Sequence, residues 1–187
     1  MSEQNVADPG PLGLAGFAMT TFCLSTHNAN LWAGAGVLAA LSLALIYGGA
    51  VQIAAGMWEF ARKNTFGATA FTSYGAFWIG LYLLLNVQAG GGTADAVGIY
   101  LLAWTIFTLY MTVAAAKINT ALFVLFVVLT ITFIFLTIGA WGAGHADMTK
   151  IGGWLGILTA FIAWYTSAAG VINETHGKVV LPVGPRG

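Results

Sequence analysis

The stretch ALFVLFVVLTITFIFL, residues 121–136, is sixteen residues long and carries no charge. A strand of a membrane β-barrel would belong to a series of segments of about ten residues that alternate apolar and polar side chains. This stretch shows no such alternation. It lies inside a longer uncharged run, residues 118–146, which is long enough for a helix that spans a bilayer. The stretch therefore predicts a transmembrane helix.

The composition of the whole chain supports this interpretation. Of its 187 residues, 59% are hydrophobic and only 6% are charged, whereas a soluble domain carries about 25% charged residues. So few charges cannot cover a water-facing surface, so we expect lipid to be the solvent for most of the chain. The six acidic and six basic residues balance, which argues against a nucleic-acid partner.

Charged residues divide the chain into five uncharged runs, residues 9–58, 64–94, 96–116, 118–146 and 151–173. A span needs about 20 apolar residues, so each of the last four runs holds one. The first run holds two, because the polar STHNAN interrupts it. We therefore predict an all-α integral membrane protein, a single domain over residues 1–187 with tails at 1–8 and 174–187. Its six transmembrane helices are expected at about Pro11–Thr26, Leu31–Phe60, Phe66–Val87, Ala96–Ala116, Asn119–Trp141 and Gly152–Ile172.

The loop charges predict how this bundle is oriented. With both termini in the cytoplasm, the inner loops and tail carry Arg62, Lys63, Lys117, Lys178 and Arg186, against Lys150 outside. This asymmetry satisfies the positive-inside rule, and five or seven spans would destroy it. The first eight residues lack the basic segment of a cleavable signal. We expect a multi-pass protein of the cell membrane with cytoplasmic N- and C-termini.

The predicted spans offer little for catalysis. None has Asp, Glu, Lys or Arg near its middle, and Glu59 lies at the cytoplasmic end of the second span. His27, His145 and His176 lie in turns or outside the membrane and lack the spacing of metal ligands. No nucleophile lies near a base, and the loops are too short for a soluble domain. We expect no enzymatic activity, no metal and no cofactor.

Hydroxyl side chains gather in the first, third and fifth predicted helices instead, and Gln52 lies in the second, beside a pair of glycines. Such hydroxyls commonly bond the carbonyl four residues earlier, and glycines allow helices to pack closely. Alternatively, the three helices line one path for a small polar solute. In that case the candidate hydrogen-bonding residues are Thr20, Thr21, Ser73, Thr130 and Gln52.

Three segments carry a resemblance to a known family: DPGPLGLAGFAMTT (8–21), NTFGATAFTSYGAFW (64–78) and VINETHGKVVLPVGP (171–185). Over nearly its whole length the chain resembles the acetate uptake transporter family, which includes the bacterial succinate–acetate permease. The resemblance implies six-helix protomers in a homo-hexamer, with a separate path through each protomer. It also implies passage of acetate, with succinate and similar small carboxylates as further candidates, in a channel-like or proton-coupled manner.

The resemblance also implies roles for particular residues. The aromatic and aliphatic constriction of the family maps onto Phe17, Tyr74 and Leu129, and Leu129 is expected to set the size limit. The family's Asn is Asp8 here, a carboxylate that can still cap a helix but is expected to repel anions near the entrance. The family signature at this entrance maps onto Asp8, Pro9, Pro11, Leu12, Gly13 and Leu14.

The residues leave the form of the passing solute open. A carboxylate in a path without a fixed cation costs several kcal/mol, and protonating a small acid at pH 7 costs about 4 kcal/mol. An anion channel and an acid–proton symporter are therefore both consistent with the sequence. A channel for neutral solutes, such as urea or short amides, would use the same uncharged path. A purely structural or sensory membrane protein would show no flux.

Overall fold

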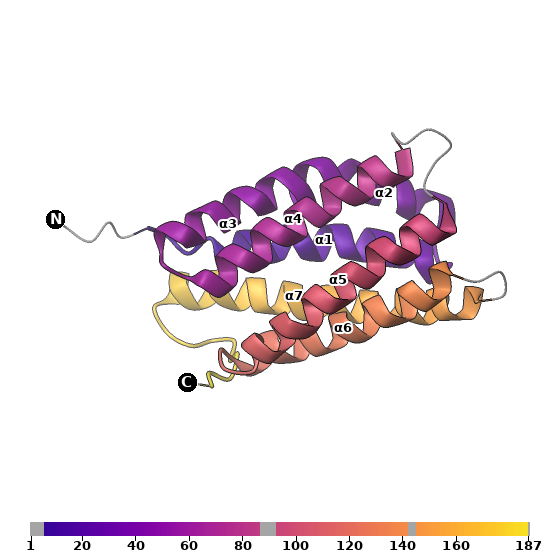
Figure 1. Cartoon of the computed structure of the whole chain (residues 1–187). Helices are drawn as coiled ribbons and strands as arrows, with labels where there is room; N and C mark the ends of the chain where they lie inside the picture. Colours follow the sequence, from indigo (N-terminus) through magenta and orange to yellow (C-terminus); the bar gives the residue numbers. More distant parts are fainter. Residues whose placement is uncertain (1–5, 87–92, 142–144, 187) are drawn as a thin grey trace.

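A computed structural model of the protein describes residues 6–86, 93–141 and 145–186. These residues form a bundle of long helices that run side by side, with both ends of the chain at the same end of the bundle (Figure 1). The elements are α1 (Gly10–Asn28), α2 (Ala33–Leu45), the π-helix η1 (Ile46–Val51), α3 (Gln52–Ala61), α4 (Thr65–Asn86), α5 (Ala94–Ala115), α6 (Thr120–Ala140) and α7 (Ala146–His176).

The number of helices agrees with the prediction. Since α2, η1 and α3 follow one another without a break, the described residues form six helical rods. The largest difference is α7, which begins at Ala146 instead of Gly152 and ends at His176 instead of Ile172. Its extra turns contain the exposed residues Asp147 and Glu174. The prediction counted only the uncharged residues that can lie in lipid, whereas the helix itself continues beyond them into water. The predicted end of the third helix, Val87, lies outside the described residues.

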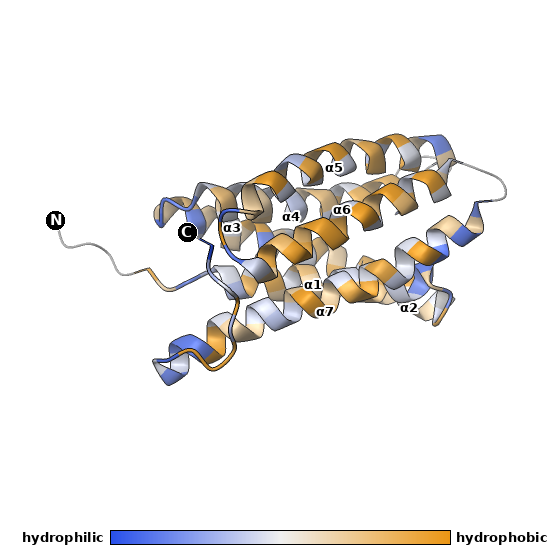
Figure 2. Ribbon diagram, turned by 90° about the horizontal axis from the view of Figure 1, so that it is seen from below, coloured by the Kyte–Doolittle hydropathy of each residue, from blue (hydrophilic) through white to orange (hydrophobic). Residues whose placement is uncertain are grey.

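In the part of the chain that the structure describes, five helices are long and apolar enough to cross a membrane, namely Gly34–Ala61, α4, α5, α6 and α7. Hydrophobic residues cover the middle of the bundle, and hydrophilic residues gather at its ends (Figure 2). The remaining helix, α1, contains three glycines and four Ser or Thr residues among its 19 residues and packs against α2, α3, α4 and α7. Because protein surrounds α1 on several sides, its side chains need not be apolar. The protein is an all-α integral membrane protein.

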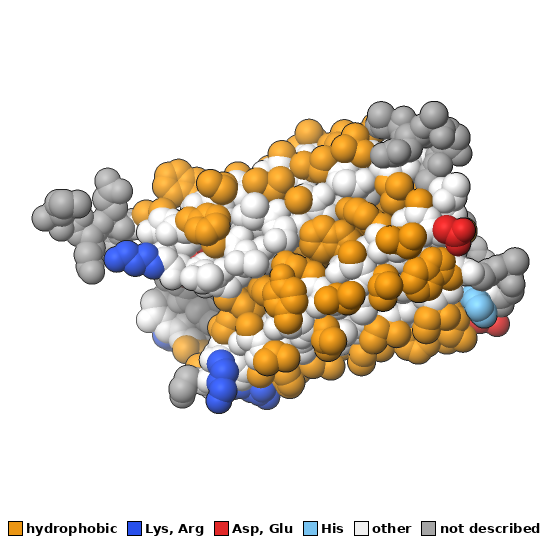
Figure 3. All heavy atoms as spheres, viewed as in Figure 1, with side chains coloured by type: hydrophobic (Ala, Val, Ile, Leu, Met, Phe, Trp, Pro, Cys, Tyr) orange, Lys and Arg blue, Asp and Glu red, His pale blue; other side chains and the backbone are white. Residues whose placement is uncertain are grey.

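On one face of the bundle, charges of opposite sign lie at the two ends. On the face shown in Figure 3, Lys and Arg lie at the end that holds both termini, and acidic side chains lie at the other end. Between these ends the same face is mostly hydrophobic. The end with the termini contains the start of α1, the end of α3 and the start of α4, which together frame the site described below.

The π-helix η1 lies against α1 in close backbone contact. A β-carbon on Gly16 would lie 2.6 Å from the carbonyl oxygen of Tyr47, and one on Gly48 would lie 2.4 Å from Oγ1 of Thr20. Glycine at both positions therefore permits this approach. A π-helical turn changes the register of the residues that follow it, and such turns are frequent at functional sites. Beyond it, α3 buries Gln52 and Glu59 on one face.

Candidate functional site

A cavity of about 270 Å³ lies between α1, α3, α4, α6 and α7, and we refer to it as the main cavity. Its wall is polar at the end of the bundle that holds the termini, where Asp8, Glu59, Asn64, Asn119 and Asn173 form a rim. Deeper in the bundle the wall is apolar and aromatic. The rest of the lining is Gly10, Pro11, Leu14, Phe17, Gln52, Phe66, Gly67, Ala70, Phe71, Tyr74, Leu122, Leu125, Phe126, Leu129, Thr166, Ala169, Gly170 and Val183.

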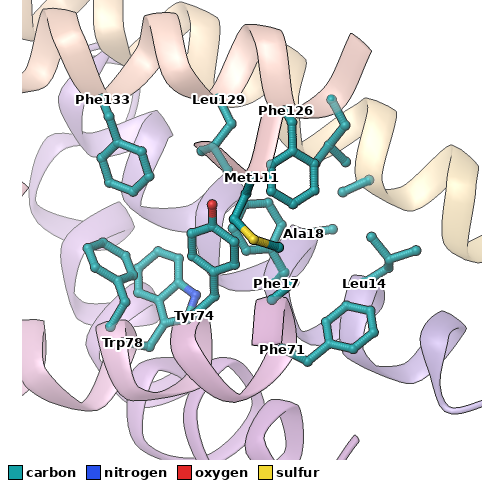
Figure 4. Close-up of a cluster of buried hydrophobic side chains, with 14 of the residues drawn as sticks. Leu14, Phe17, Ala18, Phe71, Tyr74, Trp78, Met111, Phe126, Leu129 and Phe133 are labelled. Carbon is teal, nitrogen blue, oxygen red and sulfur yellow. The ribbon is translucent and has the colours of Figure 1, made fainter. Parts of the chain in front are cut away.

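The three residues expected to form the constriction meet at the deep end of this cavity. Phe17, Tyr74 and Leu129 are the lining residues of α1, α4 and α6 that lie farthest from the rim. They are only 4%, 2% and 3% exposed, and the ring centroids of Phe17 and Tyr74 are 5.5 Å apart. Figure 4 shows Leu129 extending from its helix toward these rings. A solute that leaves the main cavity at this end must therefore pass apolar side chains.

The ring of Tyr74 is held in place by its neighbours. Its hydroxyl lies 2.9 Å from Oγ1 of Thr108. Because Thr108 already donates to the carbonyl of Trp104 at 2.7 Å, Tyr74 is the donor of the first bond. Phe107 packs edge-on against the same ring, with centroids 5.4 Å apart. These contacts from α5 hold the Tyr74 ring at the deep end of the main cavity.

A second cavity, of about 260 Å³, lies beyond the aromatic residues. It is lined by residues farther along the same helices, including Leu24 of α1, Phe77 of α4 and Leu136 of α6. Thr21 lies in sequence between Phe17 and Leu24, and its buried hydroxyl has no hydrogen-bond partner among the described residues. Phe17, Tyr74 and Leu129 thus lie at the end of the main cavity that is nearer to the second cavity.

Of the five candidate hydrogen-bonding residues, Gln52 alone lines the main cavity. It is 1% exposed, and its Oε1 has no partner in the described part of the chain. A buried polar atom without a partner costs free energy, so a ligand with a suitable hydrogen would stabilise it. Gln52 and Thr21 are therefore the two predicted residues with an unused buried polar atom.

The other three candidates lie elsewhere. Thr20 donates to the carbonyl of Gly16 at 2.9 Å, and Thr130 donates to that of Phe126 at 2.8 Å, both within their own helices. Neither residue lines the main cavity, and neither does the half-buried Ser73. Direct contact of these three side chains with a solute stays a prediction. The geometry gives Thr20 and Thr130 a role in helix packing.

The signature segment forms the start of α1 at the rim. Oδ1 of Asp8 accepts the backbone N–H of Gly10 at 3.0 Å, and the carbonyl of Pro9 accepts that of Gly13 at 3.1 Å. Pro11 and Leu14 line the main cavity, whereas Leu12 is exposed. A β-carbon on Gly13 would meet the ring of Phe71 at 2.6 Å, so glycine permits that ring to pack there.

Asp8 also forms an ion pair with Arg62, which follows the last residue of α3. The guanidinium compensates the charge of the carboxylate at the rim. Repulsion of an anion at the entrance is therefore weaker than the sequence alone suggests. The ion pair is partly exposed on both sides, 36% for Arg62 and 42% for Asp8, so water can reach it.

Glu59 is a residue of the rim that the sequence reasoning placed at a helix end and did not select. Its side chain is 2% exposed, and Nδ2 of Asn64 donates to its Oε2 at 2.9 Å. The signal was its spacing from Gln52: with Ala55 and Gly56 between them, the two residues occupy positions i and i+7 of one helix face.

The residues after α7 fold back over the start of α6. The carbonyls of Gly184 and Val183 accept the backbone N–H groups of Thr120 and Ala121 at 2.7 and 3.0 Å. These N–H groups lie in the first turn of α6, where no partner within the helix exists. Oδ1 of Asn173 holds the same segment by accepting the N–H groups of Val180 and Leu181. The tail thus completes the rim.

Comparison with known proteins identifies the family. The model of the GPR1/FUN34/yaaH family matches residues 1–185. The chain belongs to this family. It is 41% identical over 188 residues to the succinate-acetate/proton symporter SatP of Escherichia coli, with 98% of each chain covered. It is 38% identical to acetate permease A of Emericella nidulans, covering 98% of this chain and 67% of the relative. The solved structure of the bacterial acetate channel SatP matches with a TM-score of 0.90 at 41% identity, covering 96% of this chain and all of that one.

Proposed function

We propose that this protein carries acetate and similar small carboxylates, succinate among them, across the membrane without chemical conversion. The observation that carries the proposal is the main cavity, whose polar rim leads to a narrow end made by Phe17, Tyr74 and Leu129. The names of the relatives support the same solutes. The helix starts at the rim favour a carboxylate over urea or another neutral solute.

The rim suits a carboxylate without presenting an unpaired cation. The helices α1, α4 and α6 all begin there, and the start of a helix carries a partial positive charge. Asparagine side chains at positions 64, 119 and 173 line the same rim and can exchange hydrogen bonds with a solute. A carboxylate can therefore lose part of its hydration at the rim and gain compensating contacts.

The deep end imposes a different requirement. Its apolar side chains strip water from the solute, which favours a small and neutral species. Gln52 lies beside this end with an unused oxygen, and an amide can accept from a carboxylic acid as well as donate to it. The geometry thus supports passage of the neutral acid at the constriction and of the anion at the rim.

The test is uptake of labelled acetate by proteoliposomes, measured with and without an imposed pH gradient. Protein-free liposomes are the control for diffusion through lipid. We expect protein-dependent uptake that unlabelled acetate competes with and that the gradient drives. Uptake equal to the protein-free control would contradict the proposal. Flux of a neutral solute such as urea that does not depend on pH and that acetate does not compete with would favour the alternative function.

We also propose that both termini face the cytoplasm and that the protein assembles as a homo-hexamer. The concentration of Lys and Arg at the end with the termini supports the orientation. Large exposed hydrophobic side chains, such as Ile106 and Val113 on α5, can face lipid or neighbouring protomers. Protease access to the C-terminal tail in sealed vesicles tests the first proposal, and native mass spectrometry in lipid tests the second.

A further inference from the structure

Glu59 is the one charged side chain that is buried in the described part of the chain; Asp8, Asp95, Asp147 and Glu174 are all exposed. Its carboxyl group lies on the wall of the main cavity. Burial without a full set of partners disfavours the ionised form of a carboxyl group and favours the protonated one. The passage of solute proposed above leaves this group without a role.

Other features of the same site favour the carboxylate. The carboxyl group lies between the first turns of two helices: a β-carbon on Gly10 of α1 would be 3.5 Å from Oε1, and one on Gly67 of α4 would be 2.8 Å from it. Because neither residue has a side chain, both helix starts approach the carboxyl group directly, and each carries partial positive charge. The bond from Asn64 to Oε2 also favours the charged form.

The charged groups that face Glu59 nearly cancel. Asp8 lies beside the same Gly10 and is paired with Arg62, so the two together add little net charge. The residues that α6 and α7 place on the rim are neutral, and Tyr74 of α4 is at the far end of the cavity. Burial therefore opposes two helix starts and one hydrogen bond, which is the balance that a group needs in order to bind and release a proton.

A second observation connects this group to a ligand. Gln52 lies two turns deeper on the same face of α3, and its buried Oε1 has no partner among the described residues. Two such residues, seven positions apart, are about 10 Å apart along the helix axis. A carboxylic acid that passes the constriction meets the amide first and the carboxylate of Glu59 next.

We propose that Glu59 takes the proton of a carboxylic acid that has passed Phe17, Tyr74 and Leu129, so that the solute leaves the cavity as a carboxylate. This inference rests on the proposed function. In the transfer, the O–H bond of the solute breaks and an O–H bond forms on Glu59, with no change in oxidation state. Glu59 then releases the proton to water at the rim, and the reverse sequence loads an anion that enters from the rim.

The test uses infrared difference spectra of the purified full chain in lipid, recorded on addition of acetate labelled with ¹³C at its carboxyl carbon. The label moves the bands of the solute away from those of the protein. We expect acetate to increase the band of a protonated side-chain carboxyl group in the wild type. The band is expected to persist in Glu174→Gln, which changes an exposed carboxyl group of α7, and to be lost in Glu59→Gln.

Acetate flux in proteoliposomes is measured with the same variants. Glu59→Gln keeps an oxygen that accepts from Asn64, so we expect it to fold but to transport more slowly. If the band persists in Glu59→Gln, or if a wild type that carries acetate never shows it, the inference is overturned. A wild type that carries no acetate overturns the proposed function, and this proton transfer falls with it.

If Glu59→Gln does not fold, the variant Glu59→Asp tests the same inference. It keeps a carboxyl group but shortens the side chain, which moves the group away from Asn64. We expect the midpoint of the carboxyl band in a pH titration to shift relative to the wild type. An unchanged midpoint would show that the titrating group is another residue and would overturn the inference.

Discussion

The hydroxyl of Tyr74 donates to Oγ1 of Thr108 across 2.9 Å and thereby ties a ring at the deep end of the main cavity to α5. In Tyr74→Phe, Thr108 keeps its bond to Trp104, so we expect a loss of about 1 kcal/mol in the free energy of unfolding. The ring itself stays between Phe17 and Phe107. Acetate uptake should therefore stay near that of the wild type while the thermal unfolding temperature falls.

The control for that substitution is Tyr110→Phe, because Tyr110 is an exposed tyrosine of the same helix as Thr108. It should change neither quantity. A large loss of uptake in Tyr74→Phe with unchanged stability would show that the hydroxyl contacts the solute instead of holding the ring.

The side chain of Leu129 is expected to limit the size of the solute. In Leu129→Ala the deep end widens, and uptake of lactate relative to acetate should rise. Removing a buried leucine costs about 2–5 kcal/mol, so the milder Leu129→Val is measured alongside. Val124→Ala on the exposed side of α6 is the control. An unaltered lactate-to-acetate ratio in both Leu129 variants would remove this residue from the constriction.

The ion pair between Asp8 and Arg62 predicts a change in preference between acetate and succinate. In Asp8→Asn the amide oxygen can still accept from Gly10, so α1 should begin as before, while Arg62 loses its acidic partner. We expect succinate uptake to rise relative to acetate, more at low salt because salt screens exposed charges. The ion pair is partly exposed, so stability should change by less than about 1 kcal/mol.

Arg62→Gln should change that preference in the opposite direction. Asp147→Asn, in the first turn of α7 at the other end of the bundle, is the matched control and should leave it unchanged. If all three variants carry the two acids in the same ratio, the charge at the rim does not select the solute.

Close packing of α1 on η1 predicts opposite effects for two glycine substitutions. A β-carbon on Gly16 would lie 2.6 Å from the carbonyl oxygen of Tyr47, whereas one on Gly34 would have nothing within 4 Å. Gly16→Ala should lower the free energy of unfolding by about 1–3 kcal/mol, and Gly34→Ala should raise it by up to about 1 kcal/mol. Unfolding in a graded detergent series measures both. Equal effects would contradict the close contact.

Much of this architecture was predictable because the membrane imposes simple rules. Runs between charges locate the helices, and polar STHNAN separates the first two. The expected constriction residues came from a resemblance, and the structure places Phe17, Tyr74 and Leu129 on the wall of one cavity; their role in limiting the solute stays a prediction. The direction of the hydroxyls was not predictable, because neither α1 nor α6 has a distinct polar side that would mark the face toward a cavity. Thr20 and Thr130 thus lie against neighbouring helices.

Two features of the rim depend on contacts that a sequence pattern does not reveal. The burial of Glu59 requires Gly10, which is distant from it in sequence, and Gly67, which lies in the first turn of the next helix, to approach the same carboxyl group. The tail covers the start of α6 through backbone hydrogen bonds, which are independent of side-chain identity. Both were absent from the prediction for this reason.

The aromatic deep end also bears on how a membrane stores energy. The hydroxyl of Tyr74 already bonds Thr108, and the aromatic rings around it offer few hydrogen-bond partners to a continuous chain of water molecules. Protons hop readily along such chains, so a broken chain keeps them from leaking. Under the proposed function, a proton crosses the deep end only together with a carboxylic acid small enough to pass. Each acid molecule that crosses in this way carries one proton, so the pH gradient falls only in step with acid uptake.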